Sequence, residues 1–300
     1  VGQINALGYG LTLGEQSRID ETIARVVREA RVGNQYVNRN MVGAVVGVQP
    51  FGGEGLSGTG PKAGGPLYLH HLWVSSDSDV PGRALEQGLP ESVETDGDGA
   101  ADLAPTPAPG AAAPPWGPGA AFDALMHWLA KHGEAHETAA CSAFGATAAA
   151  WRARLLAGPT GERNVYALHP RRAALCLADT PAILLRQSAA ALAVGCPVIW
   201  PNNPAHAELL ARLPPLVQDQ VSLLAGGVKG GAFDVVLHHG SRDARMALLH
   251  ELAERPGPIV RLWPAPSASG GMPLEALVIE RSISINTAAA GGNASLMTIR

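Results

Sequence analysis

The apolar and polar positions of the chain follow different patterns in successive segments. Within residues 17–33 the apolar positions recur at the spacing of one helix face: Ile19, Ile23, Val26, Val27 and Ala30. Ser17 stands where an N-cap is expected and Gly33 where such a helix would end. The pattern therefore predicts an amphipathic helix, followed by a short strand at 36–38.

From about residue 120 onward, short apolar runs alternate with helical stretches. The helices are expected at 121–132, 142–156, 181–194, 205–213 and 243–254. The strands are expected at 164–169, 173–178, 197–200, 221–224, 234–237 and 259–262. Strands of four to six residues that alternate with helices indicate an α/β fold with a mainly parallel sheet covered on both faces.

The last patterned run, residues 276–287, has a different character. Ile279, Arg281, Ile283 and Ile285 occupy alternating positions, which predicts one long strand near the end of the chain. A strand so placed has few partners of its own. We expect it to pair with another sheet edge or with another subunit.

Two segments rich in small residues separate or interrupt these patterns. Residues 75–118 turn acidic and then become almost pure Pro, Ala and Gly, which predicts a flexible linker. The glycine-dense segment 43–66 also contains Val45, Val46, Pro50 and Phe51, which favour a folded loop with positive φ angles over a merely flexible one.

Charge and cysteine content exclude some classes of function. The net charge is −4 and the 22 Lys and Arg residues form no basic stripe, so this segment is not expected to bind nucleic acid. No apolar run approaches the roughly 18 residues that cross a bilayer, which predicts a soluble protein. Three cysteines in apolar surroundings, Cys141, Cys176 and Cys196, indicate buried thiols in a reducing cytoplasm. The chain begins at Val1, so we expect a fragment.

Standard catalytic motifs do not match. GTGPKAGG (58–65) lacks the glycine spacing of a dinucleotide fingerprint, and neither a Gly-x-Ser-x-Gly elbow nor a Walker loop occurs. The pairs His70–His71 and His238–His239 place adjacent residues on opposite faces of a strand, so we predict no metal site.

Three segments resemble the end of the aldehyde dehydrogenase catalytic domain: INALGYGLT (4–12), GNQYVNR (33–39) and GAVVGVQPFGGEGLSGTGPKAGGP (43–66). The last is most similar to the L-glutamate-γ-semialdehyde dehydrogenase branch, and above all to the bifunctional proline utilization A proteins. ERSISINTAAAGGNASLM (280–297) resembles the end of the same proteins. The resemblance implies a C-terminal fragment with four parts: a catalytic-domain end (1–74), a linker (75–118), a degenerate aldehyde-dehydrogenase-like domain (119–275) and a terminal strand with its motif (276–300).

The resemblance also implies a role for the glycine loop. The amides of Gly43 and Ala44 would bind the α-carboxylate of glutamate semialdehyde, and Phe51 would pack on its aliphatic stem. The nucleophilic cysteine and the general-base glutamate would lie upstream, so no catalytic residue is assigned here and the fragment alone is expected to be inactive. NAD would be bound mainly by the upstream region, and FAD by an upstream proline dehydrogenase domain.

Residues 158–201 resemble the start of an aldehyde dehydrogenase cofactor domain, and LHHGSRDAR (237–245) resembles its Gly-Ser turn at a helix start. Trp200, however, stands where the family has a lysine that contacts the cofactor ribose, so we expect no bound cofactor. The resemblance implies instead a lid that lets 280–297 close an internal cavity. Two alternatives stay open: a purely non-catalytic oligomerisation and lid module, or a fragment of a monofunctional aldehyde dehydrogenase.

The resemblance further implies partners and a location. These are the rest of its own polypeptide, a second copy in a homo-oligomer and glutamate semialdehyde, in the cytoplasm or peripheral at the inner membrane through the upstream flavin domain. An upstream DNA-binding domain stays open.

Overall fold

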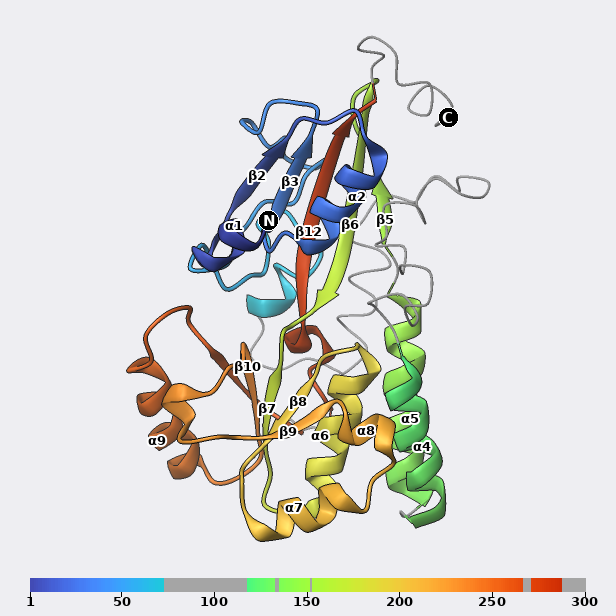
Figure 1. Ribbon diagram of the computed structural model, residues 1–300, viewed down its shortest axis with the longest axis vertical. Helices are drawn as coiled ribbons and strands as arrows, with labels where there is room; N and C mark the ends of the chain where they lie inside the picture. The colour runs from blue at the N-terminus through green and yellow to red at the C-terminus, as the bar shows by residue number, and fades with distance from the viewer. Residues whose placement is uncertain (73–117, 133–134, 152, 267–270, 288–300) are drawn as a thin grey trace. The chain divides into compact units, whose positions relative to one another are not determined.

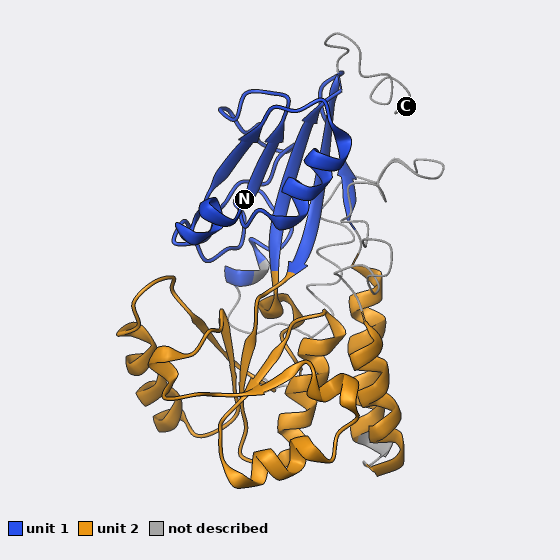
Figure 2. Ribbon diagram, in the orientation of Figure 1, with its two compact units in different colours: residues 1–114, 152–169, 279–300 blue, residues 115–151, 170–278 orange. Residues whose placement is uncertain are grey.

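The computed structural model describes residues 1–72, 118–132, 135–151, 153–266 and 271–287 (Figure 1). The chain divides into two compact units: unit 1 comprises residues 1–114, 152–169 and 279–300, and unit 2 comprises residues 115–151 and 170–278 (Figure 2). Unit 1 therefore combines segments that lie far apart in the sequence. The predicted linker, apart from Pro118, and the terminal motif beyond Thr287 lie outside the described residues.

Unit 1 is built on a five-stranded sheet. Its strands lie in the order β2 (Thr12–Glu15), β3 (Asn34–Val37), β12 (Val278–Asn286), β6 (Glu162–Pro170) and β5 (Arg154–Leu156). Strands β2 and β12 run parallel to β3, and β5 runs antiparallel to β6. The late strand β12 thus pairs with a sheet of its own chain, between β3 and β6. It begins only at Val278, because residues Leu274–Leu277 form a 3-10 helix.

Helix α2 (Asp20–Glu29) packs on this sheet through Ile23 and Val27, which share a core with Val165, Ile283 and Ile285. Its predicted ends were wrong. The helix is capped at Ile19 without a side-chain bond and ends before Ala30.

The two residues that we expected at the ends of α2 have other partners. The Ser17 hydroxyl accepts a hydrogen bond from the N–H of Ile19 at 3.1 Å, so it stands outside the helix. The N–H of Gly33 donates to the carbonyl of Gly10 at 2.9 Å, just before β3 begins. Tertiary contacts thus override the local capping signals.

The remaining elements of unit 1 are small. They are helix α1 (Gly2–Ala6), the antiparallel pair β1 (Tyr9–Gly10) and β4 (Glu54–Gly55), and the 3-10 turn η1 (His70–Leu72).

Unit 2 contains a second five-stranded sheet, and every pair in it is parallel. The strand order is β11 (Arg261–Pro264), β10 (Val235–His238), β7 (Ala174–Leu177), β8 (Val198–Trp200) and β9 (Val221–Leu223). The predicted α/β class with a mainly parallel sheet is confirmed. The chain leaves the centre first toward β9 and then toward β11, which matches the first five strands of the Rossmann order 3-2-1-4-5-6.

The helices of unit 2 follow the expected alternation. They are α4 (Ala120–His132), α5 (Ala135–Ala150), α6 (Pro181–Ala193), α7 (Pro204–Ala211), α8 (Pro215–Gln218) and α9 (Arg242–Ala253), with the 3-10 turn η2 (Val228–Gly230). Helices α6 and α9 belong to crossovers that leave the central strands in opposite directions, so they cover opposite faces of the sheet (Figure 1).

One predicted helix was too long. Residues 142–156 were expected to be helical throughout, but α5 ends at Ala150 and residues Arg154–Leu156 form β5. Leu155 lies opposite Val165 of β6 in the antiparallel register, and pairing with this sheet outweighs the local helical pattern. Among the described helices, none is long and apolar enough to cross a membrane.

Candidate functional site

The glycine-dense segment of unit 1 folds back on itself. Phe51 and Ala63 form an antiparallel bridge in which each N–H donates to the other residue's carbonyl, at 3.0 and 2.8 Å. Behind this bridge, a Cβ added to Gly33 would lie 1.9 Å from the carbonyl oxygen of Gly52. Glycine at position 33 therefore lets the loop approach the start of β3. The loop is folded, as predicted.

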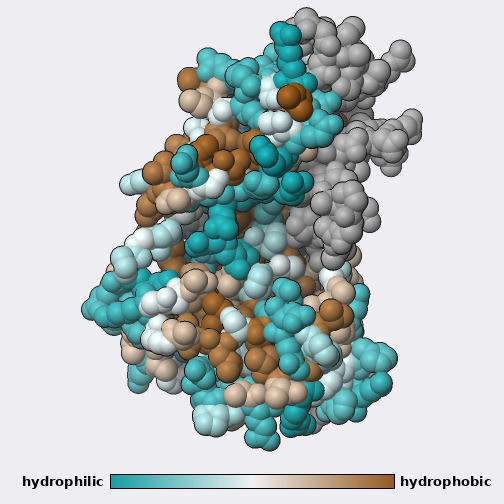
Figure 3. Space-filling view, viewed as in Figure 1, coloured by the Kyte–Doolittle hydropathy of each residue, from teal (hydrophilic) through white to brown (hydrophobic). Residues whose placement is uncertain are grey.

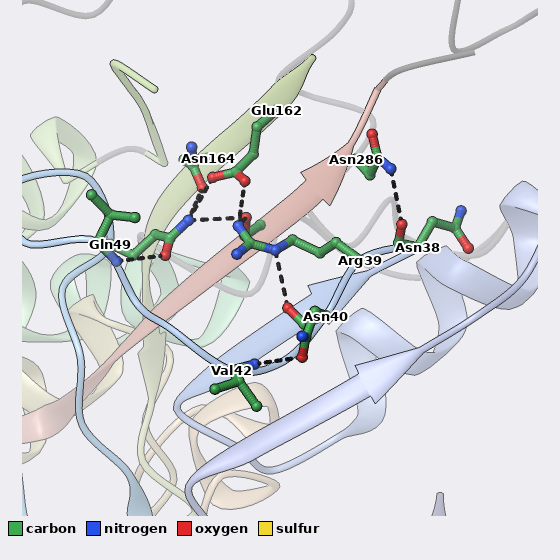
Figure 4. Close-up of polar contacts among 10 residues, drawn as sticks. Asn38, Arg39, Asn40, Val42, Gln49, Glu162, Asn164 and Asn286 are labelled. Carbon is green, nitrogen blue, oxygen red and sulfur yellow. Dashed lines mark hydrogen bonds and ion pairs between the residues drawn. The ribbon is translucent and has the colours of Figure 1, made fainter. Parts of the chain in front are cut away.

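The backbone amides of Gly43 and Ala44, which were predicted to bind a carboxylate, lie between two backbone amides that donate to side chains. The N–H of Val42 donates to Asn40 Oδ1 at 3.0 Å, and the N–H of Val45 donates to Gln49 Oε1 at 3.1 Å (Figure 4). Between them, the N–H groups of Gly43 and Ala44 donate to no residue in the described part of the chain. Gly43 has φ +84° and is exposed, and Ala44 is half-buried. The predicted pair is thus available to an outside acceptor.

Gln49 connects this segment with the sheet. Its side-chain Nε2 lies 2.6 Å from Glu162 Oε1, 3.0 Å from Asn164 Oδ1 and 3.2 Å from Ser284 Oγ (Figure 4). Glu162 and Asn164 belong to β6 and Ser284 to β12. One buried amide therefore joins the loop to two strands from later in the sequence.

Arg39 neutralises the carboxylate in this cluster. Its guanidinium forms an ion pair with Glu162 and donates to Ser284 Oγ at 2.8 Å. It also lies 5.1 Å from the centre of the Tyr36 ring, in cation–π geometry. Glu162 is only partly exposed, and such a carboxylate needs a partner because an unpaired charge withdrawn from water is costly.

A second buried network surrounds Lys62. Its Nζ donates to Asn34 Oδ1 at 2.8 Å and to the carbonyl of Gly52 at 2.6 Å. Burial lowers the pKa of the Lys62 ammonium to about 7, although Glu280 and Glu54 act in the opposite direction. The lysine side chain thus clamps the loop to the first residue of β3.

Two strands close this network from the other side. The Tyr166 hydroxyl of β6 donates to Glu280 Oε1 of β12 at 2.7 Å, and burial raises the pKa of Tyr166. Arg281 pairs with Glu54 at 3.2 Å. Burial also lowers the pKa of His169, with the Arg281 charge adding to the effect, so the imidazole is neutral at pH 7.

Sequence reasoning missed Gln49, Lys62 and Glu280. The one available signal lay in the last strand, where Glu280, Ser282 and Ser284 occupy every second position. These polar side chains share one face of β12 and bond to the loop, as when Ser282 Oγ donates to the carbonyl of Pro50 at 2.6 Å.

The thiols of unit 2, which could act as nucleophiles, are buried. All three cysteines are free and buried. Burial raises the pKa of Cys141 to about 11, and it also raises the pKa of Cys176 and of Cys196. His239 Nδ1 lies 3.4 Å from Asp179 Oδ2. No group of three or more His, Cys, Asp or Glu side chains that could hold a metal occurs among the residues that the structure describes.

The Gly-Ser turn of unit 2 lies at the switch point between β7 and β10, where Rossmann-type sheets bind ligands. Ser241 Oγ accepts from the N–H of Ala244 at 3.1 Å, so it caps α9. Trp200 is completely buried, and its Nε1 donates to Ser188 Oγ at 2.9 Å. Trp200 is therefore a core residue whose one side-chain donor is engaged by Ser188.

Comparison with known proteins finds a family likeness in the first quarter of the chain. Residues 1–75 match the model of the aldehyde dehydrogenase family. The chain is also 52% identical over 77 residues to 1-pyrroline-5-carboxylate dehydrogenase 1 of Halalkalibacterium halodurans (25% of this chain, 15% of that protein).

Other matches extend over the whole chain. The chain is 49% identical over 300 residues to the bifunctional protein PutA of Escherichia coli (strain K12), and 40% identical over 304 residues to that of Rhizobium meliloti. Each match covers 100% of this chain but only 21% and 22% of the relative. Over its whole length the chain is therefore similar to about a fifth of the bifunctional protein PutA, and the predicted resemblance is confirmed.

The fold comparison agrees. The solved structure of proline utilization A from Corynebacterium freiburgense superposes with a TM-score of 0.52 at 20% identity, over 94% of this chain and 23% of that one. The two chains share the fold.

Proposed function

We propose that this chain contributes to the oxidation of proline to glutamate by a full-length bifunctional enzyme, in which it binds the α-carboxylate of L-glutamate γ-semialdehyde during the NAD-dependent second step. The observation that carries this function is the pair of adjacent N–H groups at Gly43 and Ala44, which donate to no described residue. The names of the relatives, a bifunctional PutA and a 1-pyrroline-5-carboxylate dehydrogenase, support the substrate class.

The chemistry of this chain is orientation. Two backbone amides that point at one carboxylate act as an anion site, and the positive φ of Gly43 turns the backbone there. Phe51, half-buried next to the loop, packs along the aliphatic stem of the substrate. Holding the carboxylate at a set distance from the aldehyde carbon places that carbon at the nucleophile. The cysteine nucleophile, the general-base glutamate, most NAD contacts and FAD belong to the rest of the polypeptide.

Exposed apolar side chains support the rest of the polypeptide as the partner of unit 1. Leu7, Tyr9 and Val42 are 66–73% exposed, and Figure 3 shows apolar side chains in brown on the visible face of this unit. Apolar surface of this kind marks protein contacts. Because the chain spans about a fifth of its relatives, the remaining dehydrogenase core in the same cytoplasmic protein, or in a second copy within a homo-oligomer, is the proposed occupant.

Unit 2 fits a second, non-catalytic role as a lid and assembly module. Its cysteines are buried with raised pKa values, and the place of the ribose-binding lysine is taken by the buried Trp200. A fragment of a monofunctional dehydrogenase is disfavoured, because the match to the 1-pyrroline-5-carboxylate dehydrogenase covers only 25% of this chain, whereas the match to the bifunctional protein of Escherichia coli covers all of it.

The anchoring function is tested in the full-length enzyme with Ala44→Pro, which removes one of the two N–H donors. The matched control is Val46→Pro, since position 46 follows the first residue of the turn from Val45 to Val48 and its N–H donates to no described residue. NAD reduction is measured with glutamate semialdehyde and with propanal, which has no carboxylate.

We expect Ala44→Pro to raise the KM for the semialdehyde about tenfold, the effect of one hydrogen bond to a charged group of roughly 1.5 kcal/mol. Propanal kinetics and the Val46→Pro enzyme should stay unchanged. Anchoring at these amides would be refuted if Ala44→Pro changed the KM equally for both aldehydes. It would also be refuted if both proline variants raised the KM for the semialdehyde equally. The chain alone should show no activity, and a core lacking it should regain activity when the two are mixed.

A further inference from the structure

Gln49 completes a closed turn at the proposed carboxylate site. The N–H groups of Val48 and Gln49 donate to the carbonyl of Val45 at 3.1 and 3.0 Å, and the Gln49 side chain returns to the N–H of Val45 at 3.1 Å. The residue after Ala44 is therefore bonded through both its carbonyl and its amide. This bonding holds the backbone on one side of the two free amides in a single conformation.

The orientation of the Gln49 amide follows from its neighbours. Val45 N–H is a donor, so the oxygen of Gln49 must face it and the NH₂ group must face Glu162, Asn164 and Ser284. The NH₂ group has two protons for three acceptors at 2.6, 3.0 and 3.2 Å, so the bond to the Glu162 carboxylate dominates. A flipped amide would set two donors against each other at Val45.

The residues that accept hydrogen bonds from the Gln49 side chain lie outside residues 1–75, the segment that matches the aldehyde dehydrogenase model. Glu162 and Asn164 lie on β6 and Ser284 on β12. Gln49 is only 4% exposed, so its side chain acts on the loop and does not reach a substrate.

We propose that Gln49 is a positioning residue that presents the amides of Gly43 and Ala44 to the substrate carboxylate, and that Glu162 of β6 fixes Gln49 in that role. The role of Gln49 rests on the carboxylate-anchoring function proposed above. The two late strands thereby set the affinity of the loop for the semialdehyde.

The test uses the full-length enzyme with Gln49→Glu and Gln49→Met. Gln49→Glu keeps an acceptor for Val45 but places a second carboxylate against Glu162. In Gln49→Met the side chain keeps a similar length but forms neither hydrogen bond. This variant provides the test if Gln49→Glu fails to fold. For both, we expect the KM for glutamate semialdehyde to rise about tenfold while its kcat and the propanal kinetics change less than about twofold.

A charge-swapped double variant tests the partner. In Gln49→Glu/Glu162→Gln, the new amide at 162 donates to the new carboxylate at 49 and the net charge of the cluster is kept. Asn164 Nδ2, which is buried with no hydrogen-bond partner in the described structure, can then donate to residue 49 after an amide flip. We expect the KM to return to within about threefold of wild type.

The outcomes separate the two ideas. If Ala44→Pro raises the semialdehyde KM but neither Gln49 variant does, the positioning role is wrong and anchoring stands. If the Gln49 variants lower kcat equally for both aldehydes, Gln49 is merely structural and the positioning role is again wrong. If Ala44→Pro leaves the semialdehyde KM unchanged, the anchoring function itself fails.

Discussion

The backbone N–H of Lys62 donates a 2.7 Å hydrogen bond to the carboxylate of Glu280, which lies 218 positions later in the chain. The other oxygen of Glu280 accepts from the hydroxyl of Tyr166. One buried carboxylate thus joins the glycine loop, β6 and β12. The stability of the glycine loop therefore depends on two strands that lie more than 90 residues later in the sequence.

Tyr166→Phe tests the contribution of this carboxylate to stability. The substitution removes the hydroxyl that donates to Glu280 Oε1 at 2.7 Å, so this buried carboxylate loses one hydrogen bond. We expect the free energy of unfolding to fall by about 1–3 kcal/mol. Urea unfolding followed by circular dichroism measures the change, and Tyr68→Phe, at a 43% exposed position, is the control. Equal stabilities of the two variants would contradict the importance of the Glu280 bond.

Lys62 should make stability depend on pH in a distinctive direction. Its pKa is about 7 in the folded chain, against an ordinary value of 10.5. Between these pH values the unfolded chain binds a proton that the folded chain does not, so the free energy of unfolding rises with pH, by up to about 1.4 kcal/mol per unit. Below about pH 7 both states are protonated and the burial cost is fully present.

The variant Lys62→Met isolates this effect. Urea unfolding of wild type and variant is compared at several pH values from 7.5 to 9.5, roughly the window between the two pKa values. We expect the wild type to gain stability relative to Lys62→Met as the pH increases. A constant or falling difference would show that Lys62 keeps its proton when buried.

The sequence pattern predicted the α/β class and the parallel sheet of unit 2 because short apolar runs report buried strands directly. It did not predict where β12 would pair. Alternation at Ile283 and Ile285 marks a strand, but the partner β3 lies some 250 positions earlier, and no local signal encodes it. The ends of α2 were wrong for a similar reason, because the amide of Gly33 is bonded to Gly10.

The candidate site was partly accessible from the sequence. The resemblance pointed to Gly43 and Ala44, and the structure leaves their amides without described acceptors. Gln49 and Lys62 gave no signal, because glutamine and lysine in a loop are ordinarily solvated. Their burial follows from contacts with β3, β6 and β12, which exist only once the sheet has formed.

Trp200 supplies a test of the degenerate character of unit 2. Trp200→Lys restores the residue type that the family resemblance implies at this position, but it places an ammonium in a completely buried site. We expect a loss of about 4 kcal/mol or more in the free energy of unfolding and no NAD binding by isothermal titration calorimetry. Leu216→Lys, at a 50% exposed position of the same unit, should be nearly neutral. A stable Trp200→Lys protein that binds NAD would show that one substitution disabled the site.

Gly33→Ala tests how closely the loop must approach the sheet. The added Cβ would lie 1.9 Å from the carbonyl oxygen of Gly52 and 2.9 Å from its carbon, both backbone atoms that no side-chain rotation can move. Relief requires the loop to shift away from β3, which weakens the bond from Lys62 Nζ to that carbonyl. We expect a loss of about 3 kcal/mol in urea unfolding, at the upper end for an overpacked site.

The same variant should also expose the neighbouring strand, because the N–H of Ser282 donates to the carbonyl of Gly33 at 2.9 Å. Hydrogen exchange at Ser282 should therefore accelerate in Gly33→Ala. Gly2→Ala is the matched control, since no atom lies within 4 Å of its added Cβ. If the two variants unfold alike and Ser282 stays equally protected, the loop can retreat from β3 at little cost, and the close approach at Gly33 does not hold the site together.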